Sequence, residues 1–124
     1  MGRKIIVVDD SSVIRSQVAN VLAGAGYRIV EAANGNEGLK RIEEHADAAM
    51  VLSDINMPQM SGIEMLVQMK AGGKNAALPV IMLTTEGNVE LMTQAKRAGA
   101  KAWIVKPFRD ELLVETVRKI AGPA

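Results

Sequence analysis

The sequence contains no cysteine, so neither a disulfide framework nor a thiolate metal site can be built. Its aromatic residues are Tyr27, Trp103 and Phe108, too few to form a surface on which nucleic-acid bases stack. The formal net charge of +1 supplies no general attraction for nucleic acids or acidic membranes. No apolar run approaches the ~20 residues that cross a bilayer, and the first residues lack the pattern of a signal peptide. We therefore expect a soluble, cytoplasmic protein that binds neither nucleic acid nor membrane.

The length of 124 residues suits one domain and leaves too little chain for a second. A domain of this size buries roughly two-thirds of the surface that its unfolded chain exposes, so one hydrophobic core can hold it. Apolar residues make up 48% of the sequence, which is enough to build such a core without cross-links. No linker, repeat or low-complexity stretch interrupts the chain, and we predict a single domain over residues 1–124.

Short apolar stretches alternate with amphipathic segments along the whole chain. The apolar stretches are rich in β-branched residues and predict strands over residues 4–8, 28–32, 48–53, 80–83 and 102–105. Between them apolar residues recur at helical spacing, and Ser11, Asn34 and Asn88 are suited to cap the helices that follow. His45 stands near the end of the second of these helices, where we expect it to be solvated. The apolar positions at helical spacing in the first and third helices are Val13, Ile14, Val18, Val21, Leu22, Ile63, Leu66, Val67 and Met69.

Five strand–helix units joined by short connections predict an α/β fold, in which a doubly wound, five-stranded parallel sheet carries helices on both faces. Right-handed crossovers in such a sheet place the carboxyl ends of all the strands along one edge. Open α/β sheets hold their functional sites at this edge. Side chains that end different strands are therefore expected to meet there, however far apart they lie in the sequence.

Polar or charged residues end four of the predicted strands. Asp9 and Asp10 follow the first strand, Asp54 the third, Thr84 the fourth and Lys106 the fifth. Carboxylates gathered at one edge repel one another: two unit charges about 4 Å apart cost about 4 kcal/mol at an effective dielectric constant of about 20. A divalent cation and the Lys106 ammonium would offset this repulsion, and Mg2+ suits a site of carboxylate oxygens with few protein ligands. The pattern predicts a magnesium site around Asp54.

Four motifs of the chain resemble those of response-regulator receiver domains. They are Asp9-Asp10, SDINMP at residues 53–58 with Gly62 after it, PVIMLT at residues 79–84, and WIVKPF at residues 103–108. The resemblance covers essentially the whole chain, with the motifs in the family's order and spacing. It implies a flavodoxin-like (βα)5 fold with strand order 2-1-3-4-5, and a receiver domain over residues 1–124 without an output domain. Within the family the chain is most similar to the stand-alone chemotaxis regulators.

The resemblance assigns the phosphoacceptor and the metal ligands. Asp54 would take a phosphoryl group from a histidine kinase as an acyl phosphate. Asp10, Asp54 and the backbone carbonyl of Asn56 would bind Mg2+ directly, and Asp9 would bind it through water. Such a protein is a phosphoacceptor switch rather than an enzyme, since it assists only its own phosphorylation and autodephosphorylation.

The resemblance also assigns the groups that respond to the phosphate. Lys106 would pair with Asp54 and then with the phosphoryl group, and the Thr84 hydroxyl would contact a phosphoryl oxygen. Trp103 stands where the family has its switch aromatic, usually Tyr or Phe, and would turn inward as Thr84 moves. The fifth strand and the last two helices would then present a changed face to a partner. The family also shows a cis peptide bond before the residue equivalent to Pro107.

Three positions beside the site bear on the lifetime of the phosphate and on the pathway. Asn56 and Glu86 match the chemotaxis regulators at two positions that tune dephosphorylation, which favours a role in motility. Thr85 is bulkier than the small residue that the family usually has there, and would hinder access to the phosphate. The implied partners are a histidine kinase, a phosphatase, and a flagellar switch or another target protein, all bound by a monomer. The alternative within the family is a stand-alone phosphorelay intermediate or a phosphate sink.

Two other classes of protein share part of this pattern. Phosphatases of the haloacid dehalogenase type also use Asp, Thr, Lys and Mg2+, but they need a second Asp two residues after the nucleophile as general acid. Asn56 occupies that position here. Flavodoxin-like FMN carriers share the fold, but Asp9 and Asp10 would repel the phosphate that their first loop must hold. Both classes are disfavoured.

Overall fold

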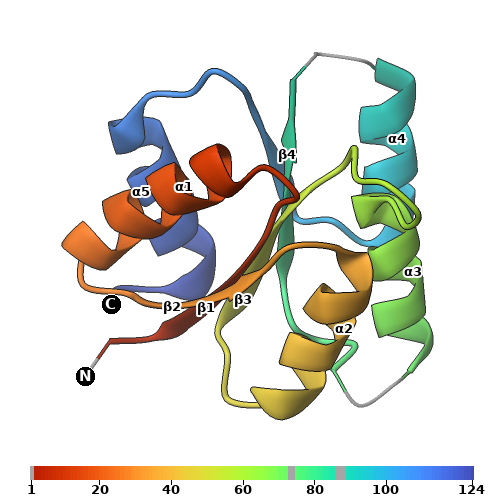
Figure 1. The fold of residues 1–124 in the computed structure, drawn as a ribbon, viewed down its shortest axis with the longest axis horizontal. Helices are drawn as coiled ribbons and strands as arrows, with labels where there is room; N and C mark the ends of the chain where they lie inside the picture. Colours follow the sequence, from red (N-terminus) through yellow and green to blue (C-terminus); the bar gives the residue numbers. More distant parts are fainter. Residues whose placement is uncertain (1, 73–74, 86–88) are drawn as a thin grey trace.

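A computed structural model describes residues 2–72, 75–85 and 89–124, so Glu86 and Asn88 lie outside the described residues. Over these ranges the chain alternates five strands with five helices (Figure 1). No helix within them combines the length and the apolar character needed to cross a bilayer. The elements are β1 (Lys4–Val8), α1 (Ser12–Gly24), β2 (Arg28–Ala32), α2 (Gly35–Glu44), β3 (Met50–Asp54), α3 (Gly62–Ala71), β4 (Val80–Thr84), α4 (Val89–Ala98), β5 (Ala102–Val105) and α5 (Asp110–Ala121).

The strands form one parallel sheet in the order β2-β1-β3-β4-β5, which confirms the predicted fold class and strand order. β1 pairs with both β2 and β3, and β4 joins β3 to β5. The chain therefore reverses its direction of winding after β2, between β1 and β3. In open α/β sheets, this point at the carboxyl ends of the strands is where binding sites form.

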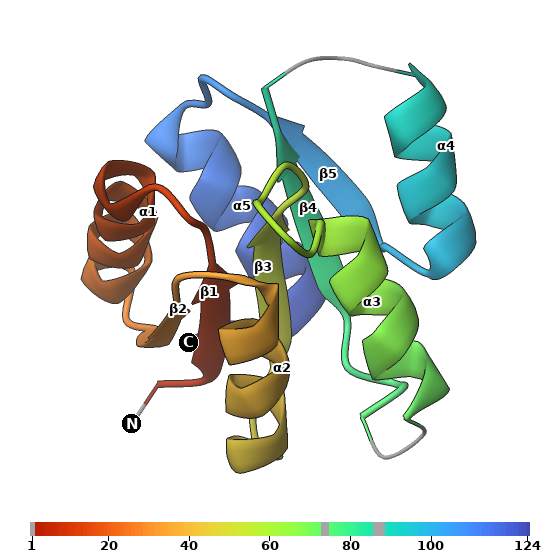
Figure 2. The same ribbon diagram turned by 45° about the vertical axis from the view of Figure 1, so that its right-hand side comes forward.

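Helices cover both faces of the sheet and divide the core into two layers. Figures 1 and 2 show α1 and α5 on one face and α2, α3 and α4 on the other. Successive side chains of a strand point to opposite faces, so Ile5 and Val7 of β1 pack with α1 and α5, whereas Ile6 and Val8 pack with the other three helices. Because both faces are covered, β1, β3 and β4 are buried along almost their whole length.

Local capping groups set where the helices begin. The side chains of Ser11, Asn34 and Ser61 accept hydrogen bonds from the backbone N–H groups of Ile14, Glu37 and Glu64, respectively. Each bond satisfies one of the backbone donors that a helix leaves unpaired in its first turn. α5 begins differently: Arg109 is its N-cap residue and makes no side-chain capping bond, while Asp110 and Glu111 place negative charge in the first turn.

The structure differs from the sequence predictions in several places. β3 begins at Met50 rather than at residue 48, because the Ala48 N–H closes a turn on the His45 carbonyl. Val13 and Val67 are 75% and 52% exposed although both follow the helical apolar spacing. His45 is partly buried instead of solvated, and its Nδ1 lies 3.1 Å from the Nζ of Lys4. The exposure of Val13 and Val67 reflects which face of each helix meets the sheet, a choice that periodicity alone leaves open.

Candidate functional site

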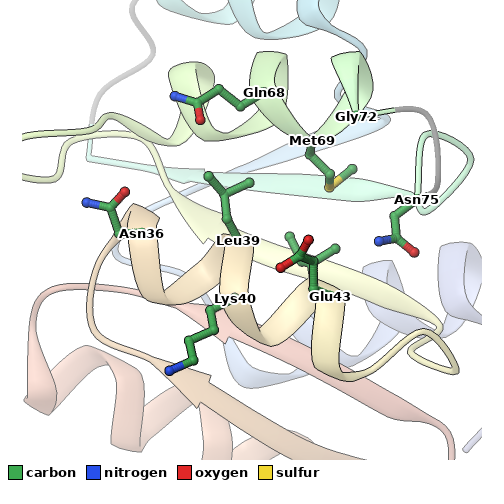
Figure 3. A pocket seen from close by; sticks show the side chains of 9 residues that line it. Asn36, Leu39, Lys40, Glu43, Gln68, Met69, Gly72 and Asn75 are labelled. Carbon is green, nitrogen blue, oxygen red and sulfur yellow. The ribbon is translucent and has the colours of Figure 1, made fainter.

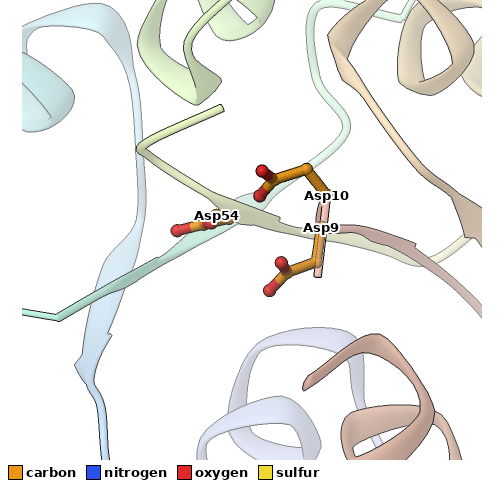
Figure 4. A group of neighbouring side chains, drawn as sticks. All are labelled: Asp9, Asp10 and Asp54. Carbon is orange, nitrogen blue, oxygen red and sulfur yellow. The ribbon is translucent and has the colours of Figure 1, made fainter. Parts of the chain in front are cut away.

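The carboxyl ends of β1, β3, β4 and β5 bring together the residues that the sequence singled out. Asp54 and Thr84 are the last residues of β3 and β4, and Asp9 and Lys106 directly follow β1 and β5. Carboxylate oxygens of Asp9, Asp10 and Asp54 all lie within 4.8 Å of one another (Figure 4). Asp10 is exposed, whereas the other two carboxylates are buried. The cluster is therefore open to solvent on the side of Asp10.

Asp9 is held at several atoms. Its backbone N–H donates to the carbonyl of Ala32, and its carboxylate Oδ1 accepts from the N–H of Ser11 at 2.9 Å. Oδ2 accepts from Lys106 at 3.2 Å, and the backbone carbonyl accepts from Nη1 of Arg15 at 2.6 Å. Sequence reasoning missed Arg15, because a single arginine in a helix carries no pattern that points to a loop carbonyl.

Asp54 lies beside charges of both signs, the Lys106 ammonium and the other two carboxylates of the cluster. The Nζ of Lys106 is 3.5 Å from its Oδ1, which is a salt-bridge distance. Burial raises the pKa of the Asp54 carboxyl above its ordinary value; Lys106 opposes that rise, while Asp9 and Asp10 add to it. The three neighbouring carboxylates therefore favour the binding of a positively charged group in the cluster.

The backbone around Asp54 is closely packed. Ser53 donates its hydroxyl to the Asp54 carbonyl at 2.9 Å, and Gly62 donates its N–H to the carbonyl of Ile55 at 2.8 Å. A Cβ on Gly62 would overlap the Asp54 carbonyl oxygen. The start of α3 therefore rests directly against the end of β3, and only glycine permits this approach.

Thr84 and Lys106 are held to each other through the backbone. Lys106 donates its N–H to the Thr84 carbonyl at 2.7 Å, and Thr84 pairs with Val105 in the sheet. Thr84 is buried, and the Lys106 side chain is mostly buried. The peptide bond between Lys106 and Pro107 is cis, as the family resemblance implied.

The loop residues that complete the predicted site are accessible. Asn56 is exposed in the β3–α3 loop, two residues after Asp54. Thr85 directly follows β4 and is also exposed, whereas Thr84 before it is buried. The two neighbouring threonines thus face different surroundings. The buried one ends β4 beside the Asp54–Leu83 pair of the sheet.

Trp103 lies on the face formed by β5 and α4. It is 38% exposed and lines a groove of about 580 Å3. On the same strand Val105 is also partly exposed, while Ile104 between them is buried. The side chains around Trp103 in the groove combine apolar and cationic groups: Val89, Met92, Thr93, Lys96 and Arg97.

A second cavity, of about 370 Å3, lies between α2 and α3 (Figure 3). Leu39 and Met69 contribute apolar side chains to its lining, whose polar members include amides and the charged residues Lys40 and Glu43. Its lining includes none of the residues of the acidic cluster. We therefore assign the candidate chemistry to the strand ends and none to this cavity.

Comparison with known proteins agrees with the fold. Residues 5–118 match the family model of the response regulator receiver domain. The chain therefore belongs to the response-regulator receiver domain family, whose members are phosphoacceptor switches rather than classical enzymes.

Within that family the similar proteins include chemotaxis regulators. The chain is 36% identical to chemotaxis protein CheY1 of Helicobacter pylori over 120 residues, 96% of this chain and 97% of that protein. The structure of Vibrio cholerae CheY4 superposes with a TM-score of 0.91 at 37% identity, covering 97% of this chain and 99% of the other. A CheX–CheY complex with BeF3 and magnesium from Borrelia burgdorferi matches with a TM-score of 0.87 at 30% identity, covering 95% and 88%.

The acidic cluster fits a hard divalent cation. Its donors are carboxylate oxygens, and one of them belongs to an exposed residue through which an ion with its water shell can approach. Receiver domains bind Mg2+ through such a cluster.

Proposed function

We propose that this protein is a Mg2+-dependent phosphoacceptor switch that takes a phosphoryl group on Asp54 from a histidine kinase. The observation that carries the proposal is the position of Asp54 between two further carboxylates and the Lys106 ammonium. Since the chain is a receiver domain similar to chemotaxis regulators, the pathway we propose is chemotaxis, in the cytoplasm.

The proposed reaction uses Asp54 as the nucleophile. One of its carboxylate oxygens forms a bond to the phosphorus of a phosphohistidine as the P–N bond breaks, and the histidine nitrogen keeps the electron pair of that bond. Asp10, Asp54 and the Asn56 carbonyl would hold Mg2+, with Asp9 acting through water. When bound, the ion neutralises charge on the phosphoryl oxygens.

Lys106 and Thr84 would complete the phosphorylated site. The Lys106 ammonium already lies between Asp9 and Asp54, so it can turn to a phosphoryl oxygen while keeping its contact with Asp9. Thr84 ends the neighbouring strand and would donate its hydroxyl to another phosphoryl oxygen. Positioning and charge neutralisation supply most of the catalysis in phosphoryl transfer, so the protein needs no further reactive group.

The proposed output surface is the α4–β5–α5 face. Trp103, Val105 and Leu112 are exposed apolar side chains on this face. A monomer would present it to a flagellar switch or another target, and a phosphatase would reset the site. The second candidate function is a phosphorelay intermediate or phosphate sink, which a receiver fold would also serve.

Phosphorylation by acetyl phosphate with Mg2+ tests the proposal. Mass-spectrometric mapping should place one acid-stable, base-labile phosphoryl group on Asp54. Asp54→Ala should abolish the modification and Asp10→Ala should suppress it, whereas Asp47→Ala removes an exposed carboxylate that pairs with Lys4 and should leave it unchanged. A phosphoryl group on any other residue would contradict the assignment.

A further inference from the structure

Arg15 holds the peptide unit that joins the two N-terminal acids of the cluster. Its Nη1 donates to the carbonyl oxygen of Asp9 at 2.6 Å, a short, charge-assisted hydrogen bond. That carbonyl belongs to the planar unit that runs from the Cα of Asp9 to the Cα of Asp10. Fixing the orientation of the carbonyl therefore fixes the direction in which the chain leaves Asp9 and carries Asp10.

The guanidinium of Arg15 is itself oriented by a second contact. Its Nε donates to Oε1 of Glu31 on β2 at 3.1 Å. Because the guanidinium is a rigid planar group, two of its N–H donors engaged on different partners define its plane. The Arg15 side chain is only 19% exposed, whereas Glu31 is half-exposed. The pair thus connects α1 and β2 to the loop that holds Asp9 and Asp10.

The second contact also balances charge. Glu31 offsets the positive charge of Arg15, so the pair adds little net charge beside the cluster. Lys106, by contrast, lies directly on the carboxylates of Asp9 and Asp54. Arg15 is therefore placed to orient the acidic loop without competing with a cation for its carboxylates.

We propose that Arg15, oriented by Glu31, is a positioning residue for the divalent-cation site. It sets the Asp9–Asp10 peptide plane so that the exposed Asp10 carboxylate faces the cluster. This inference rests on the proposed function, since it assumes that the cluster binds Mg2+. Groups behind metal ligands commonly have this role, because they orient the ligands that touch the ion.

Isothermal titration calorimetry of the metal-free protein with Mg2+ measures the affinity and tests the role of Arg15. Arg15→Met should weaken Mg2+ binding by about tenfold, the lower end of the loss in metal affinity that removal of such supporting groups causes. Charge alone predicts the opposite sign, because removal of a cation beside an acidic cluster would strengthen binding. An Arg15→Met protein that binds Mg2+ as tightly as the wild type, or more tightly, would overturn the inference.

Arg41 provides a matched control. It also donates to a backbone carbonyl, that of Glu31, and pairs with Glu44, but none of its hydrogen bonds is to Asp9. Arg41→Met removes the same charge and a similar carbonyl contact, and it should leave Mg2+ affinity unchanged. Equal weakening in both variants would show a general effect of charge or packing, and would also overturn the inference.

Arg15→Lys separates positioning from charge and from folding. Lysine keeps the positive charge but lacks the planar fork, so we expect binding weaker than in the wild type; unchanged affinity would contradict the positioning role. Thermal unfolding in EDTA reports the stability of each variant without metal, and the affinity of the folded protein is compared at a temperature where all are folded. If the wild type itself binds no Mg2+, the proposed function fails, a result distinct from wild-type binding that Arg15→Met does not alter.

Discussion

The Nζ of Lys106 lies 3.2 Å from Oδ2 of Asp9, closer than its 3.5 Å separation from Oδ1 of Asp54. The sequence predicted the pairing with Asp54, but the ammonium bridges both buried acids. Three carboxylates and one ammonium leave the site with two negative charges (3 − 1 = 2) when all are ionised. A divalent cation carries the charge that balances this remainder.

We expect Asp54→Asn to stabilise the metal-free protein at neutral pH. The folded protein raises the pKa of Asp54, chiefly by burial, so ionised Asp54 costs the folded state free energy that Asn does not. Urea unfolding in EDTA should give the variant the larger free energy of unfolding.

The pH dependence of that difference has a definite sign. Between the ordinary pKa of Asp54 and its raised value, the folded state binds more protons than the unfolded state, so the cost falls as pH falls. The advantage of Asp54→Asn should therefore shrink as the pH falls through the raised pKa of Asp54. Added Mg2+ should stabilise the wild type more than the variant. An Asp54→Asn protein that is less stable than the wild type at neutral pH in EDTA would contradict this account.

Gly62→Ala should destabilise the protein by about 2 kcal/mol, a typical cost of forcing an extra group into a packed site. The added Cβ would overlap the Asp54 carbonyl oxygen, so the backbone must move where it holds the phosphoacceptor. We expect slower phosphorylation by acetyl phosphate as well as a lower urea midpoint.

Gly24 is the matched control for Gly62, because a Cβ there would meet nothing within 4 Å. Gly24 is the last residue of α1, and Gly24→Ala should stabilise the protein by about 0.5 kcal/mol through reduced chain entropy. Similar losses in the two alanine variants would mean that the close approach to Asp54 is not the cause.

Thr85→Ala should modestly speed loss of the phosphoryl group. Thr85 is exposed directly after the buried Thr84, so its side chain can crowd the water that attacks the phosphorus. Decay of phosphorylated protein after removal of acetyl phosphate measures the rate. An unchanged or slower decay would show that Thr85 does not limit access of water.

Trp103 should report phosphorylation through its fluorescence. It is the one tryptophan of the sequence and lies partly exposed beside Met92 and Arg97. If the indole turns inward when a phosphoryl group is bound, beryllofluoride with Mg2+ should shift its emission and reduce its quenching by acrylamide. Thr84→Ala should remove most of this change while Asp54 remains modifiable.

The outcome that contradicts the Trp103 prediction is an unmoved spectrum when Asp54 is fully occupied. That result would place the signal in the helices of the α4–β5–α5 face without rotation of Trp103.

The sequence by itself determined the order of the elements and the edge at which the site lies. The apolar pattern of a strand is a local property of the sequence, so β1, β2 and β5 begin and end where the pattern predicted. Parallel strands joined by right-handed crossovers must share one carboxyl edge. Asp9, Asp54 and Lys106 could therefore be placed together before any distance was known.

Only the tertiary structure decided how these groups contact one another. The nearer contact of Lys106 to Asp9 depends on how β5 pairs with β4 in the sheet, and the bond from Arg15 to the Asp9 carbonyl depends on how α1 packs against the sheet. The exposure of Val13 likewise depends on which part of α1 meets the core. Such distances join side chains from different elements. Sequence periodicity sets which face of each element is apolar, but it does not set the rotation and translation of one element against another.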